Sequence, residues 1–183
     1  LTSDQVQSLS TSSVIALTTS QVKALTIDQA FALTTDQVQA LETVDVAVLS
    51  SYQLNALSTA QVAAFQTNQV AAIASDALVG FGAGAVAALE SAQVGALSSS
   101  QLNGFETNQV QAIETADLQG VTTANLQQLK TTSVAALTSD QVQSLSTSSV
   151  IALTTSQVKA LETVDVAVLS SYQLNALSTA QVA

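Results

Sequence analysis

The sequence contains no Cys, His, Met, Pro or Trp, and only 9% of its 183 residues are charged. Without His, it lacks the side chain that most often acts as a general acid or base near neutral pH. Without Cys, it can form no disulfide, no reactive thiolate and no thiolate metal site. We therefore expect neither catalysis nor a cofactor.

Positive charge is also scarce, because Lys23, Lys130 and Lys159 face thirteen acidic residues and the net charge is −10. Binding to nucleic acid or to anionic membranes draws on Lys and Arg that neutralise phosphates. The longest apolar stretch, residues 77–89, is shorter than the roughly 20 residues of a membrane-spanning helix. We expect no nucleic-acid partner and no membrane insertion.

An octapeptide repeat runs through the whole sequence without insertion or deletion. The first place of each unit holds a large apolar residue, the sixth is Val or Leu except at Ala30, and the eighth is usually Ala or Gly. Twenty-two full units are followed by a stub of seven residues. Residues 1–183 are expected to form one array, cut from a longer one.

Segments longer than the octapeptide are also repeated exactly. Residues 137–161 reproduce residues 1–25, and residues 162–183 reproduce residues 42–63. Such identity indicates a recent expansion of a repetitive gene, or an assembly from copies of one block.

The period of eight limits the fold. A continuous α-helix turns about 100° per residue, so an eight-residue pattern slips about 80° per unit and forms no stable face. A β-solenoid is the main alternative, because Thr and Val favour strands, but only six Gly are present to make its turns.

The positions of the charges favour helices. All thirteen acidic residues stand at the second, fourth or fifth place of their units, whereas Lys23 and Lys159 stand at the seventh. The helix dipole favours acid in the first turn and base in the last. We predict an all-α solenoid with one helix of under two turns per unit.

Two starting points for each helix are open. Thr34 and Gln37 fit a capping box with the cap at the second place, while the frequent Ser or Thr at the third place offers a cap one residue later. The helix then covers roughly the third or fourth place to the eighth or ninth. Places one, six and eight are expected inside, and places two, four and seven outside.

The polar columns and the acidic pairs each have a structural and a functional interpretation. The fifth-place Gln residues could form a ladder that binds a glycan or another chain, or could close caps and satisfy buried backbone groups. Glu42 with Asp45, repeated as Glu162 with Asp165, could attract calcium or a sugar substrate, but the helix dipole already explains their places. The structural interpretation is favoured throughout, so no catalytic or metal residue is assigned.

The best candidate for an interface is the divergent pair of units at residues 73–88, which contains Gly80, Phe81, Gly82 and Gly84. It could be a hinge or a tight contact with a second solenoid, or it could reflect neutral drift. Tyr52 and Tyr172, both at the fourth place, are further candidates to contact a neighbouring chain.

Segments such as LTTSQVKAL and LSTAQVAAF resemble the octapeptide arrays of very large repetitive bacterial surface proteins, of the adhesin-like or exported filament-forming kind. The resemblance implies an extracellular or cell-surface structural role as a stalk, fibre or self-assembling filament. Its partners would be copies of itself, bound laterally or end to end, and surface glycans. The alternative is a ligand-binding module that uses the Thr/Gln face for polysaccharide or ice.

Overall fold

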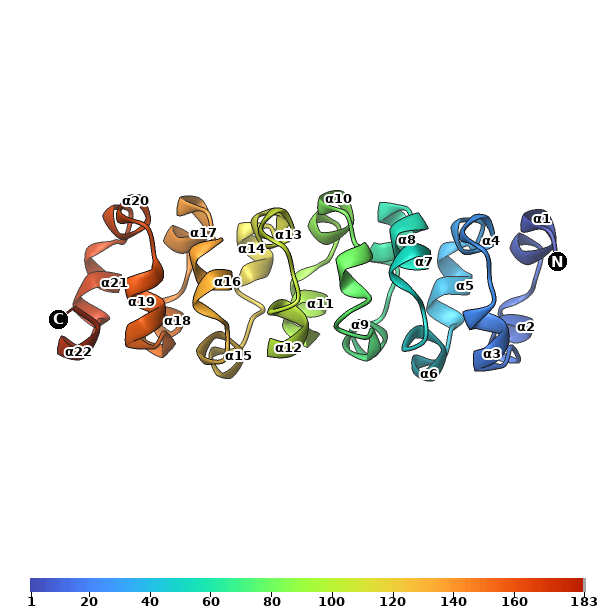
Figure 1. Cartoon of the computed structure of the whole chain (residues 1–183), viewed down its shortest axis with the longest axis horizontal. Helices are drawn as coiled ribbons and strands as arrows, with labels where there is room; N and C mark the ends of the chain where they lie inside the picture. The colour runs from blue at the N-terminus through green and yellow to red at the C-terminus, as the bar shows by residue number, and fades with distance from the viewer. Residues whose placement is uncertain (183) are drawn as a thin grey trace.

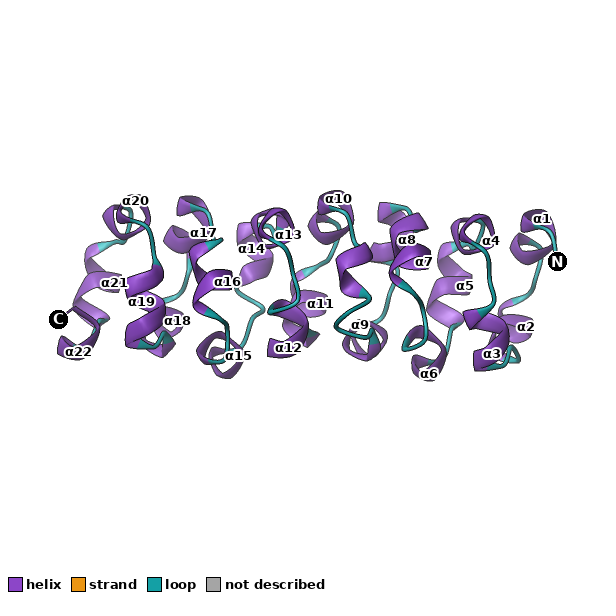
Figure 2. Ribbon diagram, viewed as in Figure 1, coloured by secondary structure: helices purple, strands orange, loops and turns teal. Residues whose placement is uncertain are grey.

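The structure, a computed structural model, describes residues 1–182 as a rod of short helices with its termini at opposite ends (Figure 1). No β-strand occurs within these residues (Figure 2). The predicted all-α solenoid is thus confirmed, and the β-solenoid alternative is wrong.

Each octapeptide forms one element. The elements are α1 (Ser3–Gln7), α2 (Thr11–Ile15), α3 (Thr19–Lys23), α4 (Ile27–Phe31), α5 (Thr35–Ala40), α6 (Thr43–Val46), α7 (Ser51–Ala56), α8 (Thr59–Ala63), α9 (Thr67–Ala72), the 3₁₀ turn η1 (Leu78–Gly80), α10 (Ala83–Ala87), α11 (Ser91–Ala96), α12 (Ser99–Leu102), α13 (Thr107–Ala112), α14 (Thr115–Leu118), α15 (Thr123–Gln127), α16 (Thr131–Ala135), α17 (Ser139–Ser144), α18 (Thr147–Ala152), α19 (Thr155–Ala160), α20 (Thr163–Ala167), α21 (Ser171–Ala176) and α22 (Thr179–Val182).

The helices begin at the third place because the second place provides the cap. In α5 the Thr34 Oγ1 atom accepts a hydrogen bond from the Gln37 backbone N–H at 3.2 Å. The Thr34 backbone N–H in turn donates to Gln37 Oε1 at 2.8 Å. This reciprocal capping box satisfies two backbone N–H groups at the helix start. It resolves the choice between the two predicted caps in favour of the second place.

Successive helices wind into a superhelix. Most elements pack on the third element further along the chain, as α4 does on α7 and α15 on α18. Hydrogen bonds from Gln side chains reach back 28 to 31 residues. One superhelical turn therefore takes between three and four octapeptides.

The fifth-place Gln residues join each superhelical turn to the preceding one. Gln69 Oε1 accepts from the backbone N–H of Gln66 at 2.8 Å, while its Nε2 donates to the carbonyls of Val38 and Leu41 at 2.9 and 2.7 Å. One amide thus completes a cap and crosses to the neighbouring turn, which is possible because it has both an acceptor and a donor.

This pattern confirms the structural interpretation of the Gln column and excludes an exposed ladder over most of the rod. The buried members are Gln37, Gln53, Gln61, Gln69, Gln93, Gln101, Gln109, Gln141, Gln157, Gln173 and Gln181.

The first and sixth places form one apolar core that is continuous along the rod. The eighth place was expected to share this core, but it is only half-buried in most units. Its side chain is small for another reason: the backbones of neighbouring turns approach closely there. A Cβ on Gly80 would lie 2.0 Å from the Ser51 carbonyl oxygen, and one on Gly120 would lie 2.1 Å from that of Ser91.

Candidate functional site

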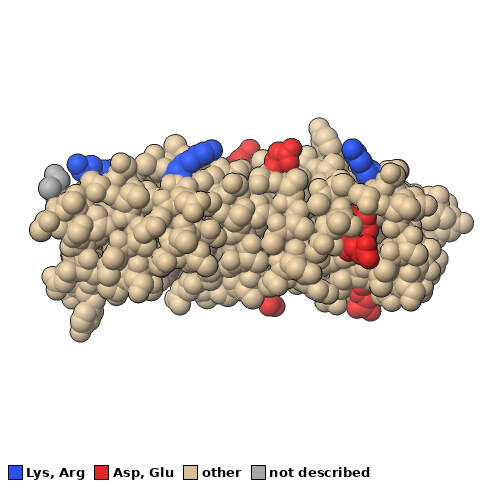
Figure 3. Space-filling model, turned by 90° about the horizontal axis from the view of Figure 1, so that it is seen from below, with Lys and Arg blue, Asp and Glu red and all other residues tan. Residues whose placement is uncertain are grey.

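The outer surface carries few charges. Lys23, Lys130 and Lys159 are exposed, and so are fourth-place acids such as Asp36 and Asp140. Figure 3 shows these charges scattered over a face that is otherwise neutral. Ser, Thr, Asn and Gln at the second, fourth and seventh places can donate and accept hydrogen bonds, so the surface is polar without being strongly charged.

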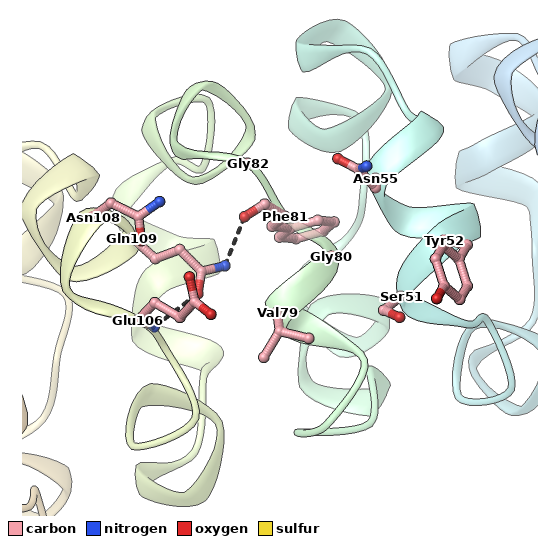
Figure 4. Close-up of a pocket in the computed structure, with 10 residues that line it drawn as sticks. All are labelled: Ser51, Tyr52, Asn55, Val79, Gly80, Phe81, Gly82, Glu106, Asn108 and Gln109. Carbon is pink, nitrogen blue, oxygen red and sulfur yellow. Dashed lines mark hydrogen bonds between the residues drawn. The ribbon is translucent and has the colours of Figure 1, made fainter.

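A shallow cavity of about 300 Å³ on this surface spans three superhelical turns (Figure 4). We call it the groove, and it is lined by Ser51, Tyr52, Asn55, Val79, Gly80, Phe81, Gly82, Glu106, Asn108 and Gln109. Helix α7, the η1 turn with the residues after it, and helix α13 contribute in that order.

The groove exists because the unit at residues 73–80 lacks the side chains that build a normal helix. Ala74 and Ala77 replace the capping Ser or Thr and the Gln of other units, and only the η1 turn forms. Gly80 brings the backbone of this turn against Ser51, while Gly82 leaves open space where a side chain would stand. The divergence of this unit therefore produces a local hollow.

The structure brings together four of the six predicted interface residues. Tyr52, Gly80, Phe81 and Gly82 all line the groove. The Phe81 ring is buried, so it supports the groove without presenting a surface for contact. Gly84 lies outside it on α10, and Tyr172 lies on α21, near the C-terminal end of the rod.

Sequence reasoning missed Asn55, Glu106 and Asn108, which supply most of the exposed polar edge of the groove. Tyr52, Gly80 and Asn108 are spaced 28 residues apart, which is close to one superhelical turn. This spacing could have identified the set, but only if the number of units per turn had been known.

The groove can hydrogen-bond and stack against a ligand. The phenol of Tyr52 and the amides of Asn55 and Asn108 offer donors and acceptors, and the exposed Val79 side chain offers an apolar contact. Glu106 adds one exposed carboxylate. Nowhere in residues 1–182 do three or more potential metal-ligating His, Cys, Asp or Glu side chains gather.

Of the two acidic pairs considered for calcium, only the later copy caps its helix. In the later copy, Glu162 and Asp165 close a capping box, and Asp165 also accepts a hydrogen bond from the Ser139 hydroxyl at 2.7 Å. In the earlier copy Glu42 is exposed, whereas Asp45 is buried and its two carboxylate oxygens have no hydrogen-bond partner among the described residues. Asp45 stands at the fifth place, where most units have Gln.

A profile of one protein family, described as the ALTTAQ repeat, matches five tandem segments: residues 14–43, 38–75, 86–112, 110–147 and 158–183. Together these segments cover most of the chain.

The chain belongs to the ALTTAQ repeat family. Each ALTTAQ match spans at least three octapeptides. Gly80, Phe81, Gly82 and Gly84 fall between two matches, in the unit pair that departs most from the octapeptide pattern. Searches of curated proteins and of solved structures found no match.

No helix in residues 1–182 combines the length and the apolar character needed to cross a bilayer.

Proposed function

We propose that this chain is a structural repeat protein without catalytic activity, which acts outside the cell as a stalk, a fibre or a self-assembling filament. The observation that carries the proposal is the rod itself: the same contact between turns recurs along the chain, and the termini lie at opposite ends (Figure 1). Such a shape separates whatever is attached to its two ends.

The bonding between turns suits a mechanical spacer. Extending the rod along its axis separates neighbouring turns, so it must break the Gln bonds and expose the core that those turns share. Because each turn contacts mainly its neighbours, the equivalent contacts lie in series along the axis and an extension is distributed over all of them.

The sparsely charged surface supports an extracellular location. Exposed hydroxyl and amide groups with few charges give little opportunity for nonspecific electrostatic binding. The resemblance to repetitive bacterial surface proteins points in the same direction.

The proposal has two tests. Small-angle X-ray scattering of the purified chain should give the profile of a stiff rod, with a cross-section that does not change with salt. A protease added to intact cells that make the protein should degrade it. A flexible-coil profile, or complete protection in intact cells, would contradict the proposal.

A second candidate function is saccharide binding at the groove. The polysaccharide or ice alternative relied on a joint Thr/Gln face, but the Gln column is largely buried. The groove offers the exposed Tyr52 with Asn55 on the same helix, and Asn108 two superhelical turns further along (Figure 4), so a saccharide of several units can stack on the Tyr ring and hydrogen-bond the amides.

The two tyrosines provide a matched test of this candidate. Tyr52 and Tyr172 occur in identical local sequences and both are exposed, but only Tyr52 lines the groove. Neutral oligosaccharides are titrated against the chain by calorimetry. Tyr52→Ala should abolish binding and Tyr172→Ala should leave it unchanged, whereas equal effects would exclude the groove as the site.

A further inference from the structure

Main-chain carbonyl oxygens converge on the fifth-place side chain of the next turn. In α5 the Nε2 atom of Gln37 lies 2.9, 3.2 and 2.8 Å from the carbonyl oxygens of Val6, Gln7 and Leu9 in the preceding turn. Carbonyl oxygens carry negative partial charge, so a group that they surround must donate hydrogen bonds or be positive. The Gln amide meets this requirement with its N–H groups.

Three units have Asp instead of Gln at this place: Asp45, Asp117 and Asp165. An ionised carboxylate only accepts hydrogen bonds, so it cannot take over the donor role of the amide. Asp117 is only half-buried, and water can therefore hydrogen-bond to its carboxylate. The two buried carboxylates need other partners.

The chain itself provides these partners for Asp165. The Oδ1 atom of Asp165 accepts from the Ser139 hydroxyl at 2.7 Å, and its Oδ2 atom accepts from the Glu162 backbone N–H at 3.2 Å. Ser139 stands 26 residues earlier, in the preceding turn. A buried fifth-place carboxylate therefore faces the turn before it, as the Gln amides do.

Asp45 lies in an identical octapeptide, LETVDVAV, but has neither of these donors. Its side chain is 1% exposed, and both carboxylate oxygens are without a hydrogen-bond partner in residues 1–182. Thr19 stands 26 residues before Asp45, and its hydroxyl does not donate to this carboxylate. Because an unpaired carboxylate is strongly disfavoured away from water, Asp45 requires a partner from outside the chain.

The surroundings of Asp45 in the preceding turn are also oxygen atoms. Helix α6 packs on α3 (Figure 1). The offsets of 31 and 28 residues that hold for Gln37 and Gln53, in the units before and after, place the carbonyls of Val14 and Leu17 opposite Asp45. Val14 lies in the last turn of α2, where the helix dipole favours a cation. A carboxylate opposite carbonyl oxygens can be joined to them by a positive ion.

We propose that Asp45 binds one calcium ion together with the carbonyl oxygens of Val14 and Leu17. Every ligand is an oxygen atom, as calcium prefers, and the ion takes the bridging role that the Gln amide has in other units. Glu42, three residues before Asp45, is exposed and its side chain makes no cap hydrogen bond, so it supplies a second carboxylate from the solvent side. Water completes the coordination.

This ligand set predicts a weak site. Calcium affinity rises with the number of charged ligands, and extracellular modules with few of them have dissociation constants of about 10⁻⁴–10⁻³ M. Magnesium should bind less well, because it demands near-ideal octahedral geometry and gives up its water reluctantly. The calcium ion joins two superhelical turns, so it should stabilise the folded chain.

Thermal unfolding of the full chain at constant ionic strength tests the site. Calcium chloride at about 10 mM should raise the melting temperature by at least about 3 °C, because the ion binds the folded chain and not the unfolded one. Sodium chloride of equal ionic strength should not reproduce this shift. Equilibrium dialysis measures the bound calcium directly.

Asp45→Asn is the decisive variant. Asn125 shows that an Asn at the fifth place can donate to a carbonyl 28 residues earlier, at 2.8 Å. The variant should therefore keep the helical circular dichroism spectrum, while its melting temperature changes by less than about 1 °C with calcium. Glu42→Gln should retain a calcium response but bind the ion several-fold more weakly, since one of two charged ligands is lost.

Asp165→Asn is the matched control, because its octapeptide is the same and its carboxylate already has donors within the chain. Asp165→Asn and Asp117→Asn should both keep the calcium-induced shift of the unmodified chain. An equal shift in Asp45→Asn would overturn the proposal, and so would an unmodified chain that does not respond to calcium. A shift that sodium chloride reproduces would overturn it too, because screening of the net charge of −10 would then be the cause. None of these results changes the scattering profile that tests the proposed structural function.

Discussion

At the scale of the residue, the amide of Gln is suited to the fifth place because it accepts and donates from one end of a three-carbon side chain. Asn125 shows the limit of a shorter amide. Its Nδ2 reaches the carbonyl of Leu97 in the preceding turn at 2.8 Å, but it does not complete a capping box. Both the length and the chemistry of Gln are therefore used.

Replacing a buried Gln with Glu separates these two roles. Gln109 donates to the Leu78 carbonyl at 2.9 Å and accepts from the Glu106 backbone N–H. Gln109→Glu keeps the acceptor but places a buried negative charge opposite carbonyl oxygens, so it should lower the free energy of unfolding by about 2–4 kcal/mol. Gln111→Glu, on the exposed side of the same helix, should change it by less than about 0.5 kcal/mol. Urea unfolding measures both, and similar losses would contradict a specific role for the fifth place.

Replacing an acidic residue at the fifth place with Gln should stabilise the protein, and Asp45 is the position to test, in buffer without calcium. Its buried carboxylate has no hydrogen-bond partner among the described residues, whereas a Gln there would complete the cap and reach the preceding turn. Asp45→Gln should raise the free energy of unfolding by about 1–3 kcal/mol. Asp36→Asn, at an exposed place in the first turn of α5, serves as the control and should lower it by no more than about 1 kcal/mol, because it removes one charge that the helix dipole favours. A lower melting temperature for Asp45→Gln would show that the carboxylate has a stabilising partner.

At the scale of the element, most of each helix could be predicted from eight residues. Thr34 and Gln37 identify the cap, and the acidic residues identify the first turn, because both act within one helical turn. The choice between the second and third place could not be made, since Ser or Thr at either place can cap a helix. The unit at residues 73–80 is divergent in sequence, but the close approach of its Gly80 to Ser51 in the preceding turn could not be predicted from eight residues.

The glycines of this region should respond oppositely to the same substitution. No Gly in residues 1–182 has a positive φ, so the difference comes from space alone. Gly80→Ala would place a methyl group against the Ser51 backbone and should lower the free energy of unfolding by about 1–3 kcal/mol. Gly84→Ala, inside α10 with no close neighbour, should raise it by about 0.4–1 kcal/mol. Thermal unfolding compares the two, and a shift in the same direction for both would contradict the close approach at Gly80.

At the scale of the whole molecule, the number of units per turn could not be predicted from the sequence. Because nearly every octapeptide presents the same side chains, the pattern does not indicate which distant unit a given unit contacts. Which distant unit is contacted depends on two distances. One is the reach of a Gln side chain, as at Gln69, and the other is the approach of the eighth-place residue to the backbone of the preceding turn, as at Gly80. The groove follows from this register, so it could not be derived in full from the repeat.

The register also sets a minimum length for folding. Residues 33–56 form three units. This fragment is shorter than the 28-residue separation of the residues that bond across turns, so it can form none of those bonds. Helices this short are marginal in water on their own. The fragment should give a coil spectrum by circular dichroism, whereas residues 33–96, which include the bonds from Gln61, Gln69 and Gln93, should be helical and unfold cooperatively. Adding further units should raise the melting temperature in decreasing steps, because each new turn adds one contact to a longer stack. Full helicity in the three-unit fragment would show that the octapeptide is stable by itself and that the contact between turns contributes little.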